Sequence, residues 1–259
     1  MTIEIIDSHA HLDFEEFEAD FNDILARAKD AGVVSMITIG SSDGFESAPK
    51  AIALAEKYSN IWASAGIHPH AAATEFNPTK LKEFCTHPRV VAIGETGLDF
   101  FRDWSPKEDQ ERWFRAQIEI AKELKKPLII HSRNAGAECF SILSETKAME
   151  VGGVFHCYSE DAEFAKKLRD INFLVSFPGT ITFKKNDALR EIVKAIPIEQ
   201  IMVETDAPYM SPEPFRGKRC ESAFVAETAK MVAKVKAVSY THLRAHETKA
   251  NLVCRLLLE

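Results

Sequence analysis

The sequence predicts an α/β protein of the (β/α)8 TIM-barrel class. Short apolar runs alternate with amphipathic stretches along nearly the whole chain, which is typical of parallel strands joined by crossover helices. Eight such runs fall within 259 residues, and roughly 250 residues are typical of a barrel of eight strands. A doubly wound open sheet is the competing class, but no G-x-G-x-x-G follows the first run, as it does in many of its nucleotide-binding members.

Each apolar run is a candidate strand. The runs occupy residues 3–7, 33–40, 61–66, 90–95, 127–131, 153–157, 173–177 and 201–206. Helical periodicity lies between them: Leu25, Ala28 and Gly32 close the first such stretch, 106–125 is the longest, and 187–196 is a short one. With no linker, repeat or low-complexity segment, we expect one domain over residues 1–237.

Composition limits the function. Hydrophobic residues make up 46% of the chain, and 32 Lys and Arg against 39 Asp and Glu give a formal net charge of −7. An acidic surface attracts no nucleic acid in general, so a polyanionic substrate has to be held locally. The five widely spaced cysteines favour a reducing compartment over a disulfide framework or zinc knuckle. Without a signal peptide or a transmembrane run, we expect a cytoplasmic protein with no membrane attachment.

Polar residues end one apolar run after another. In a barrel of this class the functional residues lie where strands end and the following loops begin. An H-x-H pair alone is weak evidence for a metal, because buried histidines are common in cores. Convergence of several such strand ends, however, predicts a metal cluster. The residues at these positions are His9, His11, His68, His70, Glu95, His131, His156 and Asp206.

These residues lie in motifs that resemble the TatD family of metal-dependent hydrolases, which have amidohydrolase-like barrels. The motifs are DSHAHLD, GIHPH, GETGLD, PLIIHSR, FHCYS, ETDAPY and RGKR, in this order. The resemblance runs from Ile5 to about Lys236. It implies a deoxyribonuclease that cleaves phosphodiester bonds with a metal-activated water, acts as a 3′ to 5′ exonuclease and has a role in DNA repair.

Four histidines and two carboxylates exceed one tetrahedral centre with an open position, but they suit two divalent ions. The resemblance implies that His9, His11 and Asp206 hold the first ion, that His131 and His156 hold the second, and that Glu95 bridges both. Mg²⁺ or Mn²⁺ suits nuclease action, and Zn²⁺ suits histidine ligands.

Further residues have expected roles around the ions. Asp206 is the expected general base, and His68 is placed to assist a leaving group or to bind phosphate. Glu204 shares strand parity with Asp206, so we expect it to orient a ligand or touch a metal-bound water. Asp7 shares parity with His9, and a salt bridge within the barrel is an equal alternative for it.

The expected substrate is single-stranded DNA or a 3′ end, with no obligate protein partner. Arg133 lies two residues after His131 on the same face, where its guanidinium could clamp a phosphate. Arg216 and Lys218, with Arg219, can reach over the site, although an ordinary solvated cluster is the alternative. The aromatic residues after Glu95 could stack a terminal base, although packing within the loop is more common for such residues; they are Phe100, Phe101 and Trp104.

Two features depart from the family pattern. Cys220 and Ser222 follow RGKR where an Asn and a Pro are common, and we expect a looser loop or an altered substrate grip. Residues 238–259 do not continue the sequence pattern of the rest of the chain, and they are either a non-native translated segment or a terminal helix. His242 and His246 are therefore excluded from the ligand set. Two other functions stay open: hydrolysis of a lactone, amide or cyclic imide by the same class of barrel, and metal binding without catalysis.

Overall fold

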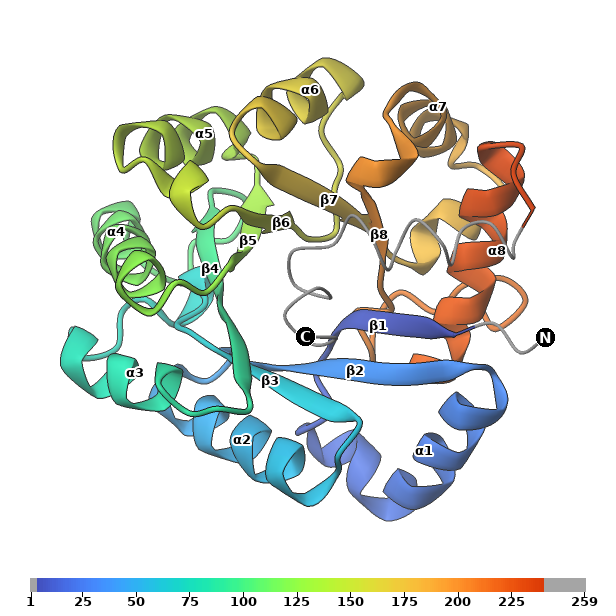
Figure 1. Cartoon of the computed structure of the whole chain (residues 1–259), viewed down its shortest axis with the longest axis horizontal. Helices are drawn as coiled ribbons and strands as arrows, with labels where there is room; N and C mark the ends of the chain where they lie inside the picture. The colour runs from blue at the N-terminus through green and yellow to red at the C-terminus, as the bar shows by residue number, and fades with distance from the viewer. Residues whose placement is uncertain (1–3, 240–259) are drawn as a thin grey trace. The chain divides into compact units, whose positions relative to one another are not determined.

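A computed structural model describes residues 4–239 and has the predicted (β/α)8 fold class (Figure 1). Within these residues eight strands alternate with eight α-helices. The strands form one sheet in chain order, from β1 to β8. Residues 240–259, including His242 and His246, lie outside the described part, so the prediction about the tail stays a prediction.

The element bounds follow the predicted order. The strands are β1 (Ile5–Ala10), β2 (Val33–Gly40), β3 (Ile61–Ala65), β4 (Val90–Asp99), β5 (Leu128–Arg133), β6 (Gly153–Phe155), β7 (Phe173–Phe177) and β8 (Ile201–Val203). The helices are α1 (Phe21–Asp30), α2 (Ser47–Lys57), α3 (Pro78–Cys85), α4 (Lys107–Leu124), α5 (Gly136–Glu145), α6 (Ala162–Asp170), α7 (Asp187–Ala195) and α8 (Val225–Val235).

Several strand ends differ from the prediction. β4 does not end at Glu95 but continues to Asp99, because Gly97, Leu98 and Asp99 pair with β5. β5 likewise runs past His131 to Arg133, whereas β8 stops three residues before Asp206. The apolar pattern ends a strand at its first charged residue, but a polar side chain can stay in a buried strand when the fold supplies partners.

The described residues form two compact units. The first unit contains residues 4–37, 157–166 and 174–239. Within it β7 and β8 pair in parallel, from Val175 with Ile201 to Phe177 with Val203. Beyond β8 the chain meets β1, where the Asp206 N–H donates to the His9 carbonyl at 2.9 Å. This contact brings the end of the last strand to the end of the first.

The second unit contains residues 38–156 and 167–173, with β3, β4, β5 and β6 paired in parallel. Gly97 of β4 lies opposite His131 of β5. Its φ is 128°, a value that residues other than glycine rarely adopt. A Cβ at this position would collide with the carbonyl oxygen of His131. Glycine therefore permits the close approach that fixes the backbone of His131.

Helix α4 carries two buried glutamines, seven residues apart and hence on one helix face. The Gln117 side chain accepts from the Ile67 N–H at 2.8 Å and donates to the Ile67 carbonyl at 3.1 Å, just before His68. The Gln110 side chain accepts from the Asp99 N–H at 2.9 Å and donates to the Ser105 carbonyl at 2.9 Å. These bonds satisfy buried peptide groups where β3 and β4 end, so α4 sets the path of both following loops.

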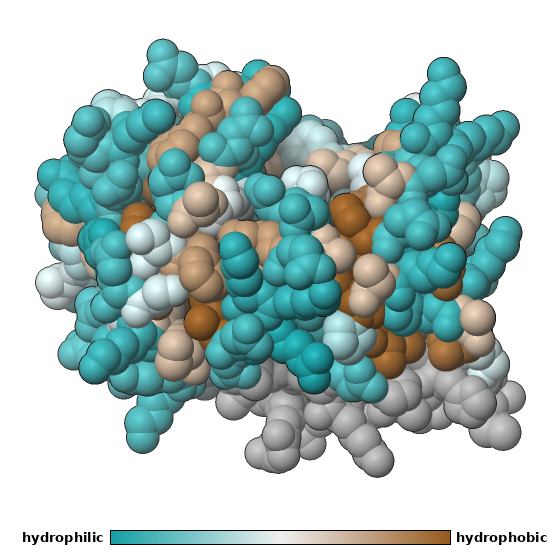
Figure 2. Space-filling view, turned by 90° about the horizontal axis from the view of Figure 1, so that it is seen from above, coloured by the Kyte–Doolittle hydropathy of each residue, from teal (hydrophilic) through white to brown (hydrophobic). Residues whose placement is uncertain are grey.

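Hydrophilic side chains cover most of the face shown in Figure 2, with hydrophobic residues between them. Among residues 4–239, no helix combines the length and the apolar character needed to cross a bilayer.

Candidate metal centres

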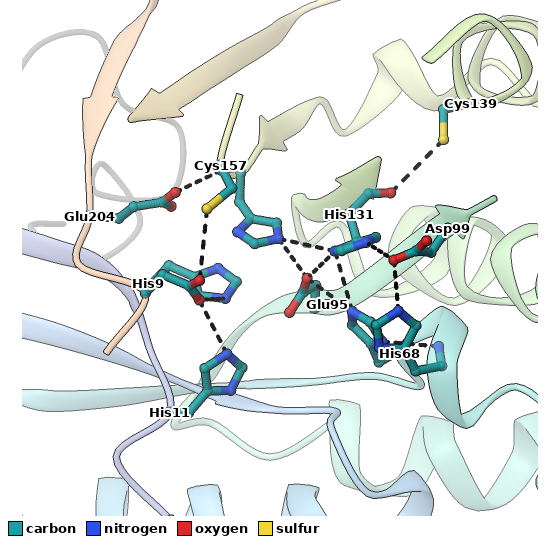
Figure 3. A network of polar contacts seen from close by, with 12 residues as sticks. His9, His11, His68, Glu95, Asp99, His131, Cys139, Cys157 and Glu204 are labelled. Atoms are coloured by element: carbon teal, nitrogen blue, oxygen red, sulfur yellow. Dashed lines mark hydrogen bonds and ion pairs between the residues drawn. The ribbon is translucent and has the colours of Figure 1, made fainter. Parts of the chain in front are cut away.

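The first unit brings together His9, His11 and Asp206. Figure 3 shows the two histidines. Nε2 of His9 and Nε2 of His11 lie 3.6 Å and 3.4 Å from the same oxygen, Oδ1 of Asp206. All three side chains are buried. The structure therefore brings two imidazoles and one carboxylate together at one point. We call these three residues the first ligand group.

Asp206 is held in place by backbone and side-chain contacts of its neighbours. Its φ of 56° lies in the left-handed region, which Asp visits more readily than most residues. The preceding Thr205 donates to Asp7 twice, from its N–H at 2.9 Å and from its hydroxyl at 2.7 Å. Asp7 is fully buried, and this burial raises its pKa to about 6 despite these hydrogen bonds. Asp7 thus ties the segment after β8 to β1.

Glu204 is also fully buried in the first unit. Its two carboxylate oxygens accept from the Cys157 N–H at 2.7 Å and from the Ser176 hydroxyl at 2.6 Å. The Cys157 thiol lies 3.8 Å from Oδ2 of Asp206. Glu204 therefore fixes the segment that presents the Cys157 thiol to Asp206. Contact of Glu204 with a metal-bound water stays a prediction.

The second unit gathers three histidines around one carboxylate oxygen (Figure 3). Oε1 of Glu95 lies 2.6 Å from Nε2 of His156, 2.9 Å from Nδ1 of His131 and 3.3 Å from Nε2 of His68. Burial by itself raises the pKa of Glu95, but the surrounding histidines outweigh it and hold that pKa well below its usual value. Glu95 is therefore ionised near pH 7. We call Glu95, His131 and His156 the second ligand group.

Asp99, a residue that the sequence pattern did not single out, links the second ligand group to His70. Oδ2 of Asp99 lies 3.0 Å from Nε2 of His131 and 2.7 Å from Nε2 of His70. Burial opposes a charge on His131, yet the hydrogen bonds to Asp99 and Glu95 raise its pKa. Asp99 shares strand parity with Glu95, and this signal would have found it if β4 had been extended past the first carboxylate.

His68 lies beside the second ligand group. Its Nδ1 accepts from the His70 N–H at 3.0 Å, and its Nε2 lies 3.3 Å from Nδ1 of His131. Burial lowers the pKa of His68 to about 4, so its ring is neutral near pH 7. Such a ring can ligate a metal or exchange one hydrogen bond with a substrate.

The candidate substrate residues are surface cations. In the second unit Arg133 stacks on Phe101, with 3.9 Å from its Cζ atom to the ring centroid. In the first unit Arg216 stacks on Phe183 at 3.6 Å, and Nζ of Lys218 lies 5.7 Å from the Phe215 ring centroid. Whether any of the three binds substrate stays a prediction.

Residues 219–222 follow these cations and make contacts within the protein. Arg219 pairs with Asp20 at 2.7 Å, which gives it a structural role. Cys220 and Ser222 are both buried, and between them Glu221 pairs with Arg27 at 2.6 Å. That Cys220 and Ser222 alter substrate binding by this loop stays a prediction.

Both ligand groups fit a divalent ion by the chemistry of their donors. Neutral imidazole nitrogens and carboxylate oxygens are the ligands of Zn²⁺ and related ions in catalytic sites. Their candidate donor atoms also lie close together. In the first ligand group these atoms are within 4.8 Å of one another. In the second, Nε2 of His156 lies 2.6 Å from Oε1 of Glu95 and 3.4 Å from Nδ1 of His131. A third such triad, His70–Asp99–His131, overlaps the second ligand group through His131.

Comparisons with known proteins agree with this chemistry. The family model described as TatD related DNase matches residues 6–255. The uncharacterized metal-dependent hydrolase YabD of Bacillus subtilis is 38% identical, covering 95% of this chain and 96% of its own. The 3′-5′ ssDNA/RNA exonuclease TatD of Klebsiella pneumoniae is 31% identical, covering 96% of each chain. The crystal structure of YJJV, a TatD homologue from Escherichia coli, is similar with a TM-score of 0.90, 26% identity and 98% coverage of both chains.

Proposed function

Because the chain belongs to the TatD-related DNase family and is a metal-dependent hydrolase, we propose that it hydrolyses phosphodiester bonds at the 3′ ends of single-stranded DNA. The observation that carries this proposal is the presence of two largely buried ligand groups, each made of histidines and a carboxylate. The name of the Klebsiella relative supports a nucleic-acid substrate. Among residues 4–239, Cys85, Cys139, Cys157 and Cys220 form no disulfide, which is in keeping with action in a reducing compartment such as the cytoplasm.

His9, His11 and Asp206 would hold one divalent ion, and Glu95, His131 and His156 would hold the other. The bridging role of Glu95 stays a prediction from the sequence. When bound, ions of this kind lower the pKa of a coordinated water and offset negative charge on a phosphate.

The chain's own residues supply the rest of the chemistry. Asp206 is our candidate general base, because a carboxylate that ligates through one oxygen can accept a proton on the other. Arg133 is our candidate phosphate clamp, since its planar guanidinium donates two parallel hydrogen bonds to a phosphate. His68, in contact with Glu95, is placed to hydrogen-bond the leaving group, and Arg216 and Lys218 are candidates for more distant phosphates.

Hydrolysis of a lactone, amide or cyclic imide is the second candidate, since the same ligand groups could serve it. A neutral substrate, however, needs no exposed guanidinium beside the metal ligands. Arg133 is exposed and pairs with no carboxylate among residues 4–239. This observation favours a phosphate ester.

The test is release of mononucleotides from single-stranded DNA with Mg²⁺, Mn²⁺ or Zn²⁺ added to metal-stripped protein. Glu95→Ala and Asp206→Ala should each reduce the rate by at least ~100-fold, as expected when a ligand or general base is lost. Asp170→Ala, which removes an exposed carboxylate at the end of α6 in the second unit, should turn over like the unmodified chain. Equal rates for all four proteins would refute the assignment. Turnover of a lactone or cyclic imide without DNA cleavage would favour the second candidate.

A further inference from the structure

Residues 100–105 form a short loop after β4, which we call the aromatic loop. It carries the two most exposed large hydrophobic residues among residues 4–239, Phe101, which is 56% exposed, and Trp104, which is 61% exposed. Exposed single hydrophobic residues are ordinary, but here two large exposed rings lie within four residues, and the Arg102 guanidinium is 5.7 Å and 5.1 Å from their centroids. Burial among the loop's own residues therefore does not explain why they are aromatic.

Guanidinium groups accompany both rings. Cζ of Arg133 lies 3.9 Å from the centroid of Phe101, and Cζ of Arg102 lies 5.1 Å from that of Trp104. Within the described part of the chain neither arginine forms an ion pair, whereas Arg112 pairs with Asp109. Stacking on a ring leaves the guanidinium edge able to donate to an anion. The aromatic loop thus combines ring faces with available cationic donors.

The aromatic loop is anchored to the second ligand group. The N–H groups of Phe101 and Arg102 both donate to Oδ1 of Asp99 at 2.9 Å. The other oxygen of Asp99 contacts His131, and the ring of Trp104 lies 4.4 Å from the ring of His70. The exposed rings are therefore held in fixed positions beside a metal ligand of the same unit.

We infer that Phe101 and Trp104 form a stacking platform for the bases of a single strand, while Arg133 and Arg102 bind its phosphates. This inference rests on the proposed function and adds the contact by which the strand is held. Aromatic faces combined with cationic donors are the recurring means of binding single strands without sequence preference. A net charge of −7 gives no general attraction for DNA, so such a local contact is needed.

A peptide is a poorer occupant of the same surface. An extended peptide is held mainly by hydrogen bonds to backbone groups of its receptor. In the aromatic loop the N–H groups of Phe101 and Arg102 are already bonded to Asp99. The groups left for a ligand are ring faces and guanidinium donors, which match bases and phosphates.

The experiment measures binding of fluorescent oligothymidylate whose 3′-terminal linkages are phosphorothioates that slow cleavage. Phe101→Ala and Trp104→Ala should each weaken binding by ~5- to 100-fold, the range for loss of one base–aromatic stack. Phe76→Ala is the matched control, because Phe76 is also exposed and also carries an arginine, Arg112, 4.4 Å from its ring centroid. It should bind as the unmodified chain does.

A second arm replaces the 3′-terminal base with an abasic residue. The unmodified chain should lose ~5- to 100-fold in affinity for this strand, whereas Phe101→Ala or Trp104→Ala should lose much less, because its stack is already gone. If the unmodified chain cleaves DNA but both variants bind and cleave with unchanged affinity and KM, the platform is refuted and the proposed function stands. If the unmodified chain neither binds nor cleaves DNA, both are refuted.

Discussion

The carboxylate of Asp99 lies 3.0 Å from Nε2 of His131, while Nδ1 of the same ring faces Glu95 at 2.9 Å. A carboxylate on one ring nitrogen keeps the proton there and leaves the other nitrogen to ligate a metal. We therefore expect Asp99→Asn to lower the affinity of the second ligand group by ~10- to 100-fold, the usual effect of losing such a partner. Calorimetric titration of metal-stripped protein with Mn²⁺ measures this directly.

Asp170→Asn is the control for that experiment, because Asp170 is exposed in the same unit and lies outside the aromatic loop. In Asp99→Asn the amide oxygen of the new side chain can still accept from the N–H groups of Phe101 and Arg102, so the melting temperature should change little. Unchanged Mn²⁺ affinity in Asp99→Asn would show that Asp99 has only the structural role of anchoring the aromatic loop.

Removal of metal should destabilise the protein, because both ligand groups are organised only in the folded chain. At a free ion concentration of 100 times Kd, one site adds about 2.7 kcal/mol to the free energy of unfolding. A chelator should therefore lower the melting temperature, and Mn²⁺ should restore it. If neither the chelator nor Mn²⁺ changes the melting temperature, the assignment of these buried side chains as metal ligands is wrong.

Counting the bound metal ions tests the two ligand groups one at a time. His11→Ala removes a ligand of the first group and His156→Ala one of the second. Elemental analysis of equilibrated protein should find about two ions in the unmodified chain and about one in each variant, as expected for a two-metal site. Loss of both ions in either variant would show that the two ions bind cooperatively.

The sequence predicted the fold class and the TatD resemblance correctly, since both depend on local patterns. Alternating apolar runs define the strands, and the i, i+2 spacing of His9 and His11 brings them together on Asp206. Asp99 was missed because a charged residue was taken as the end of β4. Its role depends on contacts that no local pattern encodes, such as the bond from its N–H to Gln110 of α4.

Gln117 should be important for stability because its side chain bonds both peptide groups of Ile67. Gln117→Leu leaves a buried donor and a buried acceptor without partners, which should lower the free energy of unfolding by about 2–4 kcal/mol. Hydrogen exchange should show lost protection of the Ile67 amide. Glu119→Leu, on the exposed face of the same helix, should cost less than about 0.5 kcal/mol. Equal costs for both variants would mean that water replaces the Gln117 bonds.

The pair of Arg27 and Glu221 joins positions 194 residues apart in the sequence, with two bonds of 2.7 Å and 2.6 Å. The Glu221 side chain is buried, whereas Arg27 is partly exposed and also contacts Asp20. Arg27→Met leaves the buried Glu221 carboxylate without its cation and should lower the free energy of unfolding by about 2–3 kcal/mol. This value is below that of a fully buried pair because Arg27 is partly exposed to water. Glu221→Gln leaves a solvated guanidinium and should lower the free energy of unfolding by about 1 kcal/mol.

Urea denaturation measures both effects. The exposed Arg115–Glu145 pair is the control, and Arg115→Met should lower the free energy of unfolding by no more than about 1 kcal/mol. If Arg27→Met costs no more than Arg115→Met, the pair does not stabilise the loop after β8.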